Sequence, residues 1–294
     1  MVDFLRSVAG VLSKSWLLKS GKEMWERNQK EWDLPLTRFQ KIVTGIYIIL
    51  DDYHSGLFPP KFSDKSAAYE NEINYDVSLP GLSQADVRQS SLRKPFWFPT
   101  GPGKYFPSFM HVVESFCRCG IVPPQRILEL GCGCGWMSEF LALMGFDVLG
   151  TTIAQGDVDE AKKRIGSIKV KGLPCSLDFT TAPMESVCET LGERGAFDAV
   201  FVFEALHHVF DWRSSIQSAY ECLKPGGYLL VFREPNMVHT FVSYRVARLS
   251  NTHEIGFRPS ELTSQMKIAG FRQVDYLKNR YHFFVAPVSL AARK

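Results

Sequence analysis

Three glycines at alternate positions follow an acidic residue in the stretch RILELGCGCGWMSEF, residues 126–140. They are Gly131, Gly133 and Gly135, and Glu129 lies two residues before the first of them. Glycine adopts positive φ angles and lets a ligand approach the main chain closely. An apolar strand precedes the loop and a helix follows it, and open parallel sheets bind ligands at such turns. The stretch therefore predicts a ligand-binding loop.

The spacing separates this loop from two nucleotide-binding fingerprints. Dinucleotide-binding loops follow G-x-G-x-x-G, whereas here G-x-G-x-G is followed directly by Trp136. A phosphate-binding P-loop requires G-K-[ST], which does not follow these glycines. The carboxylate of Glu129 disfavours a pyrophosphate and suits a cationic ligand, because like charges repel and opposite charges attract.

A second group of polar residues follows the apolar run FDAVFVF and spans Glu204 to His208. His207 and His208 are candidate general bases, since an unperturbed histidine titrates near pH ~6.5. His208 is favoured because it lies four residues after Glu204 and would share its helical face. The alternative is that either ring only packs against a ligand.

A strand–helix alternation from about residue 106 must position both groups. Such alternation implies a parallel sheet with helices on both faces. Strands are expected at 126–130, 147–152, near 174–177, 197–203, 228–234, 271–279 and 281–288, with helices between most of them.

The stretch LELGCGCG resembles motif I of the class I S-adenosylmethionine-dependent methyltransferases. Later stretches resemble further motifs of that family in the same order: FDAVFVFEALHHVFDW, LKPGGYLLVFREPN and HEIGFRPSELTSQMKIAGF. Together they cover roughly residues 105 to 285. The resemblance implies a Rossmann-like α/β fold with a seven-stranded, mostly parallel sheet whose last strand is antiparallel. It also implies S-adenosylmethionine as the cofactor.

The resemblance carries roles to individual residues. In the family the glycine loop packs on the methionine part and the ribose of the cofactor, which assigns Gly131, Gly133 and Gly135. Glu129 would hold the methionyl end. The further positions expected at the cofactor are Thr152, Gln155, Asp178, Glu204 and Tyr105.

Two of these positions depart from the pattern or match it loosely. Thr152 stands where the second strand of the family ends in an acid that holds the ribose, and a hydroxyl replaces two charge-assisted bonds by one neutral bond. Gln155 could share that contact, or Thr152 could simply cap the next helix. A similar threonine occurs in the branch that resembles cyclopropane fatty acid synthases, so a lipid or carbon acceptor stays open. Asp178, expected after the third strand, matches the acid at the adenine amino group, or it is a surface turn residue.

Residues 1–105 lack the alternation and are expected to form a helical and loop extension, an acceptor-side cap on a cofactor-binding domain at 106–294. Helices are expected at 4–18 and 36–50, and Tyr105 would cover the cofactor. An insertion at 236–253 adds side chains that could line a pocket: Phe241, Tyr244 and Arg245. Aromatic groups with few polar anchors suit a small or medium organic acceptor, methylated at oxygen or nitrogen. A regulatory protein that binds the cofactor without turnover is the alternative of another class.

Composition limits the partners and the location. The 294 residues are 45% hydrophobic and 22% charged, as in an ordinary globular protein, and the net charge of +3 is too low to indicate nucleic-acid binding. Seven cysteines, an odd number, favour reduced thiols and a cytoplasmic protein. The C-x-C spacings are atypical of zinc sites, so no metal is expected.

The N-terminal segment does not resemble a signal peptide, because charged residues interrupt its apolar run. Arg6, Lys14 and Lys19 flank an apolar helical face there, so peripheral membrane contact is a further possibility. The oligomeric state is not predicted.

Overall fold

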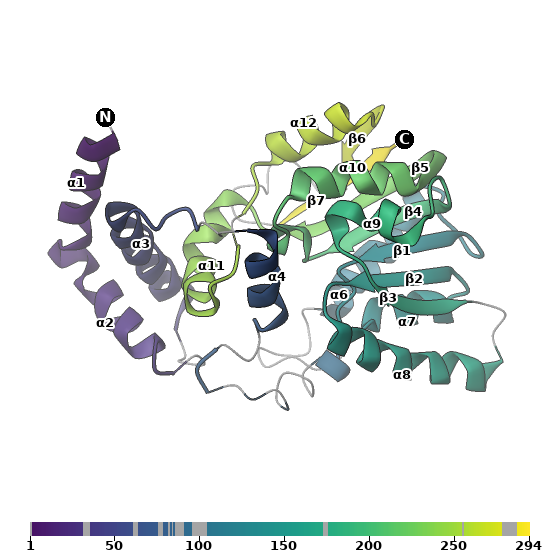
Figure 1. Cartoon of the computed structure of the whole chain (residues 1–294), viewed down its shortest axis with the longest axis horizontal. Helices are drawn as coiled ribbons and strands as arrows, with labels where there is room; N and C mark the ends of the chain where they lie inside the picture. Colours follow the sequence, from purple (N-terminus) through teal and green to yellow (C-terminus); the bar gives the residue numbers. More distant parts are fainter. Residues whose placement is uncertain are drawn as a thin grey trace. The chain divides into compact units, whose positions relative to one another are not determined.

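The computed structural model describes residues 2–31, 36–60, 64–75, 79–81, 83, 85, 91–95, 105–172, 176–254, 256–277 and 287–294 (Figure 1). The chain divides into two compact units. Unit 1 comprises Met1–Val87 and Pro235–Phe257, and unit 2 comprises Arg88–Glu234 and Arg258–Lys294. Each unit is therefore built from two separate stretches of the sequence.

Unit 2 contains a seven-stranded sheet in the order β3-β2-β1-β4-β5-β7-β6. Its strands are β1 (Arg126–Leu130), β2 (Asp147–Thr152), β3 (Leu177–Thr181), β4 (Phe197–Phe203), β5 (Leu223–Glu234), β6 (Gln273–Tyr276) and β7 (Val288–Arg293). Strand β7 runs antiparallel to β5 and β6, and the pairs among β1 to β5 are parallel. The predicted fold, a mostly parallel sheet with an antiparallel last strand, is confirmed.

Helices of unit 2 cover this sheet. They are α6 (Tyr105–Arg118), α7 (Trp136–Leu143), α8 (Gln155–Lys171), α9 (Val187–Leu191), α10 (Trp212–Cys222) and α12 (Pro259–Ala269). One buried cluster joins Phe116, Met137 and Val158, from α6, α7 and α8, to Ile127 and Phe201 in the sheet. Helix α10 contacts β4, β5, α9 and α12. The central strands are nearly continuous apolar runs because both of their faces are covered.

Strands β5 and β6 overlap the expected ranges 228–234 and 271–279 but have other bounds, and two further strands differ more from the prediction. Strand β3 spans Leu177–Thr181 rather than 174–177, because the irregular stretch around it has no clear period. The last strand is β7 at Val288–Arg293, whereas 281–288 was expected. Most of that expected segment lies outside the described residues.

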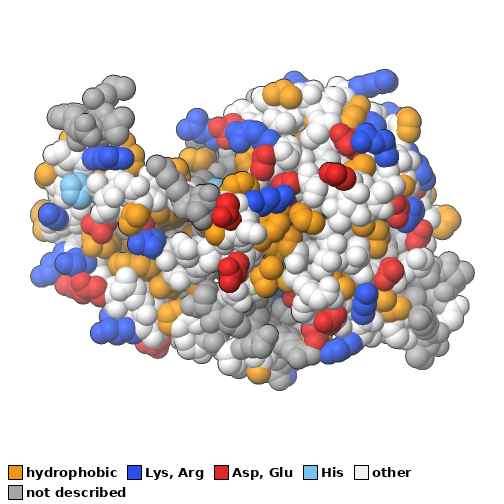
Figure 2. Space-filling model, viewed as in Figure 1, with side chains coloured by type: hydrophobic (Ala, Val, Ile, Leu, Met, Phe, Trp, Pro, Cys, Tyr) orange, Lys and Arg blue, Asp and Glu red, His pale blue; other side chains and the backbone are white. Residues whose placement is uncertain are grey.

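Unit 1 is helical in its described part. Its helices are α1 (Val2–Ser13), α2 (Lys19–Asn28), α3 (Arg38–Ser55), α4 (Lys65–Ile73) and α11 (Met237–Ser250), with a 3-10 turn, η1 (Trp16–Leu18). Figure 2 shows hydrophobic and basic side chains close together on the part of the surface formed by the first helices, at the left of the view. Helix α4 falls in a region expected to be loop. Asp64 caps its N-terminus, and the Asp64 side chain accepts a hydrogen bond from the Ala67 N–H at 2.8 Å.

Helix α11, from the insertion after β5, completes the core of unit 1. Tyr244 and Ala247 of α11 pack with Tyr47 and Ile48 of α3. The two helices cross closely at Gly45, where an added Cβ would lie 1.8 Å from the carbonyl oxygen of Phe241. Only a glycine fits this crossing without a shift of the backbone.

A buried carboxylate ties the two helices together. Asp52 of α3 accepts hydrogen bonds from the Tyr244 hydroxyl at 2.9 Å and pairs with Nε of Arg248 at 3.0 Å. Burial raises the pKa of Tyr244 above its ordinary value. Arg245 donates to Oδ1 of Asn28 at 2.6 Å. Tyr244 and Arg245, expected at an acceptor pocket, are both buried and hold α11 in place.

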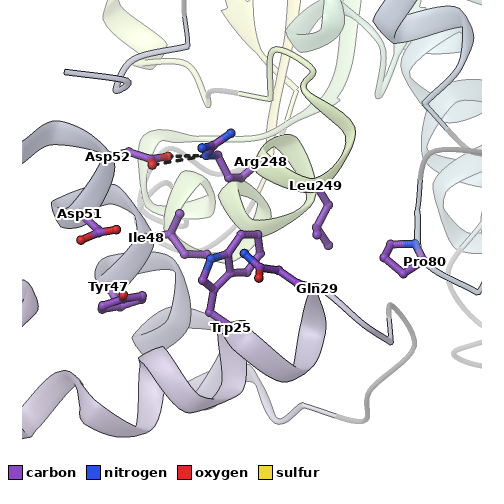
Figure 3. A pocket seen from close by; sticks show the side chains of 9 residues that line it. All are labelled: Trp25, Gln29, Tyr47, Ile48, Asp51, Asp52, Pro80, Arg248 and Leu249. Carbon is purple, nitrogen blue, oxygen red and sulfur yellow. Dashed lines mark hydrogen bonds and ion pairs between the residues drawn. The ribbon is translucent and has the colours of Figure 1, made fainter. Parts of the chain in front are cut away.

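A cavity of about 470 Å³ lies beside this network (Figure 3). Its walls come from α2, α3 and α11 and from one proline: Trp25, Gln29, Tyr47, Ile48, Asp51, Asp52, Pro80, Arg248 and Leu249. All of these residues belong to unit 1. None of the residues expected at the cofactor lines it.

Candidate active site

The glycine loop joins β1 to α7 at the carboxyl end of the sheet. Its three glycines have φ angles of +69° (Gly131), +50° (Gly133) and +72° (Gly135), which other residues rarely adopt. The N–H of Cys132 donates to the carbonyl of Thr151 at 2.9 Å, so the loop folds across the end of β2. This backbone path explains why the glycines recur at every second position.

The three glycines have different surroundings. An added Cβ at Gly131 would lie 2.6 Å from the side chain of Ala205, and one at Gly135 would lie 2.5 Å from the ring of Phe179. At Gly133 no atom lies within 4 Å of that position. Gly131 and Gly135 are thus required by packing, whereas Gly133 borders open space that a ligand can occupy. The contact with Ala205 also brings this loop beside the turn after β4, as the two motifs predict.

Glu129 is buried in β1 and accepts a hydrogen bond from the hydroxyl of Ser138 in α7. Burial raises the pKa of its carboxyl group to about 7, and the bond from Ser138 partly opposes that rise. A cationic ligand group beside it would favour the ionised form. Glu129 therefore has the charge properties expected of a residue that binds an ammonium group.

Arg164 of α8 holds the glycine loop from outside. Its Nε donates to the carbonyl of Cys134 at 2.6 Å, and its Nη1 pairs with Glu139 of α7 at 2.6 Å. Such charge-assisted bonds are stronger than neutral ones. Arg164 was not predicted as a site residue. Its contacts join residues about 25 to 30 positions apart in the chain, and no short sequence motif reveals them.

Thr152 ends β2 and is buried, with Thr181 paired opposite it at the end of β3. Its carbonyl accepts the N–H of Ala182 at 3.0 Å. Gln155 is exposed at the start of α8 and donates to Asp159 at 2.8 Å along its own helix. Hydroxyl groups therefore occupy both strand ends. A ribose contact by Thr152 or Gln155 remains a prediction.

The sequence placed Asp178 after the third strand, and this placement is wrong. Asp178 is the second residue of β3, pairs with Leu149 and is exposed. Its carboxylate accepts the N–H of Phe179 at 2.8 Å. It lies near the amino end of the strand, whereas the glycine loop lies at the carboxyl end, where Thr181 is found. The adenine contact expected of Asp178 has no support from this position.

Glu204 follows β4 and forms an ion pair with Arg233, whose Nε lies 2.9 Å from its Oε1. Both residues have positive φ angles, +48° and +57°. Non-glycine residues in this region cost about 1–3 kcal/mol each, and such strain is concentrated at functional sites. The ion pair thus joins two strained residues at the ends of neighbouring strands.

Glu234, the last residue of β5, organises the turn after β4. Its buried carboxylate accepts backbone N–H bonds from Ala205 at 2.9 Å, Leu206 at 3.0 Å and His207 at 3.1 Å. It also lies 2.8 Å from Nδ1 of His207. Because an ionised carboxylate only accepts hydrogen bonds, Nδ1 carries the proton, and Nε2 is left as the acceptor of the ring.

His208 lies in the same 3-10 turn, η4 (Leu206–His208), and its ring centroid is 4.1 Å from that of His207. The sequence favoured His208 as the base, but the carboxylate that could orient an imidazole contacts His207. Glu234 was missed because only the folded sheet brings the end of β5 to the turn after β4.

Tyr105 begins α6 and is buried in an aromatic cluster beside the loop. Its ring centroid lies 5.8 Å from that of Trp136, which follows Gly135, and 6.4 Å from that of Phe203, which ends β4. The ammonium group of Lys94 lies 5.0 Å from the centroid of the Tyr105 ring. The cluster provides an apolar wall at the carboxyl edge. Contact between Tyr105 and the cofactor remains a prediction.

No group of three or more His, Cys, Asp or Glu side chains in the described part of the chain is arranged to hold a metal ion. Among the helices that the structure describes, none is both long and apolar enough to cross a bilayer.

The central part of the sequence matches a known protein domain. A family model described as a methyltransferase domain matches residues 128–231, which include the glycine loop and the turn after β4. The chain therefore contains a methyltransferase domain. It is an enzyme with S-adenosylmethionine as its cofactor, and the open space at Gly133 and the buried carboxylate of Glu129 suit that ligand.

Relatives of this methyltransferase include proteins named ubiquinone biosynthesis O-methyltransferase. The one from Bordetella pertussis is 26% identical over 231 residues, which are 73% of this chain and 92% of the relative. The one from Ruegeria pomeroyi is 31% identical over 180 residues, 56% of this chain and 65% of the relative. The crystal structure of the [4+2]-cyclase SpnF has a similar fold, with a TM-score of 0.53, 16% identity and coverage of 77% of this chain and 96% of that one.

Proposed function

We propose that this methyltransferase transfers the methyl group to a hydroxyl oxygen of a small organic acceptor, with His207 as the general base. The observation that carries the proposal is the bond between Glu234 and Nδ1 of His207. The relatives named O-methyltransferases support oxygen as the acceptor atom. The first observation supports a base, and the names of the relatives support oxygen as the acceptor atom. Neither depends on how tightly the cofactor binds.

The chain would act by positioning and by moving one proton. S-Adenosylmethionine supplies an activated methyl group that is open to in-line displacement. The protein aligns the acceptor oxygen with that methyl and excludes water. A neutral hydroxyl must lose its proton to become a strong nucleophile, and Nε2 of His207 would accept it. Glu234 would hold the ring in one tautomer and stabilise the imidazolium that forms.

The residues proposed to hold the cofactor surround the carboxyl ends of β1 and β2. The main chain at Gly133 would contact it, and Glu129 would bind its ammonium group. Thr152 would face the ribose, and the aromatic wall formed by Tyr105 and Trp136 would exclude water. Glu204 is a further candidate.

Unit 1 is proposed to select the acceptor. It comprises most of the 1–105 extension together with 235–257, and neither part belongs to the matched methyltransferase domain. Hydroxyl compounds of ubiquinone biosynthesis are one set of acceptors to screen, because the relatives carry that name. Six described cysteines are free thiols, which supports a cytoplasmic location.

The test compares His207→Ala with His208→Ala at saturating cofactor across pH. His207→Ala is expected to reduce kcat by about 10²–10⁴, the usual effect of removing a general base, and to abolish the low-pH limb of the rate profile. His208→Ala is the matched control and should stay within about threefold. Glu234→Gln should reduce kcat and shift the profile without weakening cofactor binding.

Two results would contradict this assignment. Loss of turnover in His208→Ala alone would transfer the role of the base to His208. Full turnover in both histidine variants would show that no imidazole base is used. The acceptor would then be an amine or an ionised oxygen, aligned without proton removal.

A further inference from the structure

We propose that helix α1 and the turn η1 dock unit 1 on the surface of an anionic membrane. The proposal is independent of the acceptor and of the base described above. It rests on which face of α1 is buried, on which face is exposed, and on the charges that border the exposed face.

Helix α1 packs on α3 through small side chains. Ala9 and Ser13 are buried on the contact face, with Gly10 between them. An added Cβ at Gly10 would lie 2.5 Å from the ring of His54, so the helices approach too closely for a larger residue. Nδ1 of His54 also lies 2.9 Å from the carbonyl oxygen of Arg6. The orientation of α1 on unit 1 is thereby determined by its smallest residues.

The large apolar residues of the segment face outward as a result. Their exposed fractions are 45% for Leu5, 39% for Val8, 70% for Val11, 48% for Leu12 and 82% for Trp16. A surface helix normally buries its large apolar side chains and exposes its small and polar ones. In α1 the pattern is reversed, because small residues are buried and large apolar residues are exposed. Contiguous exposed apolar side chains mark surfaces that bind a partner or a membrane.

The charge of this segment favours a negatively charged lipid surface. The first 22 residues contain four basic residues, Arg6, Lys14, Lys19 and Lys22, against a single acid, Asp3. Their excess of +3 equals the formal net charge of the whole chain. Lys19 and Lys22 lie 4.0 and 3.8 Å from glutamates of α2, but all four side chains are more than half exposed and their pairing is weak.

The arrangement matches a helix that lies in the plane of a membrane interface. Such helices combine an apolar face with bordering Lys and Arg, and each basic residue adds attraction to anionic headgroups. Trp16 is almost fully exposed at the end of the apolar face, and tryptophan favours the interfacial region. Figure 2 shows hydrophobic and basic side chains close together on the surface formed by the first helices. The basic border beside an exposed tryptophan therefore favours a lipid surface over a protein partner.

The experiment uses the full chain and two kinds of vesicle. One is pure phosphatidylcholine, and the other also contains phosphatidylserine. The wild type is expected to co-sediment with the phosphatidylserine vesicles and much less with the neutral ones, and added salt should release it. The fluorescence of Trp16, obtained as the difference between the wild type and Trp16→Phe, should shift to the blue on binding.

Variants separate the apolar face from the charges. Val8→Asp combined with Leu12→Asp should abolish binding, and Lys14→Glu should weaken it by about fivefold or more, since one basic residue contributes about a factor of five. Ile268→Asp is the matched control, because Ile268 is 76% exposed but lies on α12 in unit 2. It should bind as the wild type does. Calorimetric unfolding with wild-type transitions for both units would show that each variant is folded.

Three outcomes would overturn the proposal. The first is a wild type that does not bind phosphatidylserine vesicles. The second is binding that survives the change at Val8 and Leu12. The third is a dimer in solution that this same change dissociates, which would assign the apolar face to a second copy of the chain.

Discussion

Two buried glutamates at the carboxyl edge of the sheet have opposite surroundings. Glu234 accepts three backbone N–H bonds and contacts Nδ1 of His207, so its charge is compensated inside the protein. Glu129 has a bond from the hydroxyl of Ser138, and its pKa is raised by burial. The first suits a group that organises the turn after β4 and orients an imidazole. The second suits a group whose ionisation responds to a ligand.

The raised pKa of Glu129 predicts a pH-dependent stability. The folded pKa is about 7, and the ordinary value is 4.5. Between these values the folded chain keeps a proton that the unfolded chain has lost, so stability falls as pH rises through this window. The loss amounts to roughly 3 kcal/mol when complete. Urea unfolding at pH 5 and pH 8 should show this fall in the wild type, and Glu129→Gln should lack it.

Cofactor binding should depend on the same proton in the opposite sense. An ammonium group favours the ionised carboxylate, so the affinity of the wild type for S-adenosylmethionine should rise with pH up to about 7 and then level off. In Glu129→Gln the affinity should be weaker and flat across this range. Equal pH dependence in the two proteins would remove Glu129 from the binding site.

At the scale of elements, the loop between β1 and α7 predicts two classes of glycine substitution. Gly135→Ala places a Cβ 2.5 Å from the ring of Phe179 at a positive φ, so it should lower the melting temperature strongly without ligand. Gly133→Ala meets no atom within 4 Å and should cost only about 1–2 kcal/mol of conformational strain. It should instead weaken S-adenosylmethionine binding, measured by calorimetry, by tenfold or more.

Gly166→Ala in α8 is the control for this pair. It has open space around it, and alanine favours a helix by up to about 1 kcal/mol over glycine. It should raise stability slightly and leave the affinity for the cofactor unchanged. If Gly133→Ala kept wild-type affinity, the open space at the loop would not be where the cofactor binds.

Helices and strands with a clear apolar pattern were predicted, and those without one were missed. Strands β1, β2 and β4 coincide with the predicted ranges, because each carries apolar residues and lies between segments with a helical pattern or a turn. Helix α4 was missed because KSAAYENEI has few apolar residues and starts from the cap at Asp64. Strand β7 was missed because VSLAAR contains small residues with no alternation, although it is almost wholly buried.

The candidate site was predictable where its residues are consecutive and not where they meet only in space. The glycine loop, Glu129 and the two histidines were found from short motifs. Glu234 and Arg164 act across strand ends, and no spacing in the sequence reveals such a contact. The placement of Asp178 failed because the irregular third strand begins later than its pattern indicated.

At the scale of the whole molecule, the two units predict separable stabilities. Asp52→Ala removes the partner of the Tyr244 hydroxyl and of Arg248, and a buried polar group without its bond costs about 1–3 kcal/mol. Calorimetric unfolding should then show a lower transition for unit 1. The unfolding transition of unit 2 should stay at its wild-type temperature. It is recognised as the transition that moves to higher temperature when S-adenosylmethionine is added, because the proposed cofactor residues lie in unit 2.

Tyr244→Phe is the milder variant, because it removes the hydroxyl and keeps the ring that packs in the core. Its effect on the unit 1 transition should be smaller than that of Asp52→Ala. A parallel fall in S-adenosylmethionine affinity in both variants would show that the two units do not respond separately.

The insertion that supplies α11 also sets an order of events during synthesis. Helices α1 to α3 leave the ribosome before α11 does. Tyr47 and Ile48 of α3 are therefore not covered until Tyr244 and Ala247 have been made. Residues 88–234, which include β1 to β5, must be made in between. At about 5–20 residues per second this takes on the order of ten seconds or more. During that interval we expect the nascent chain to expose an incomplete apolar core and to be prone to aggregation until α11 has been made.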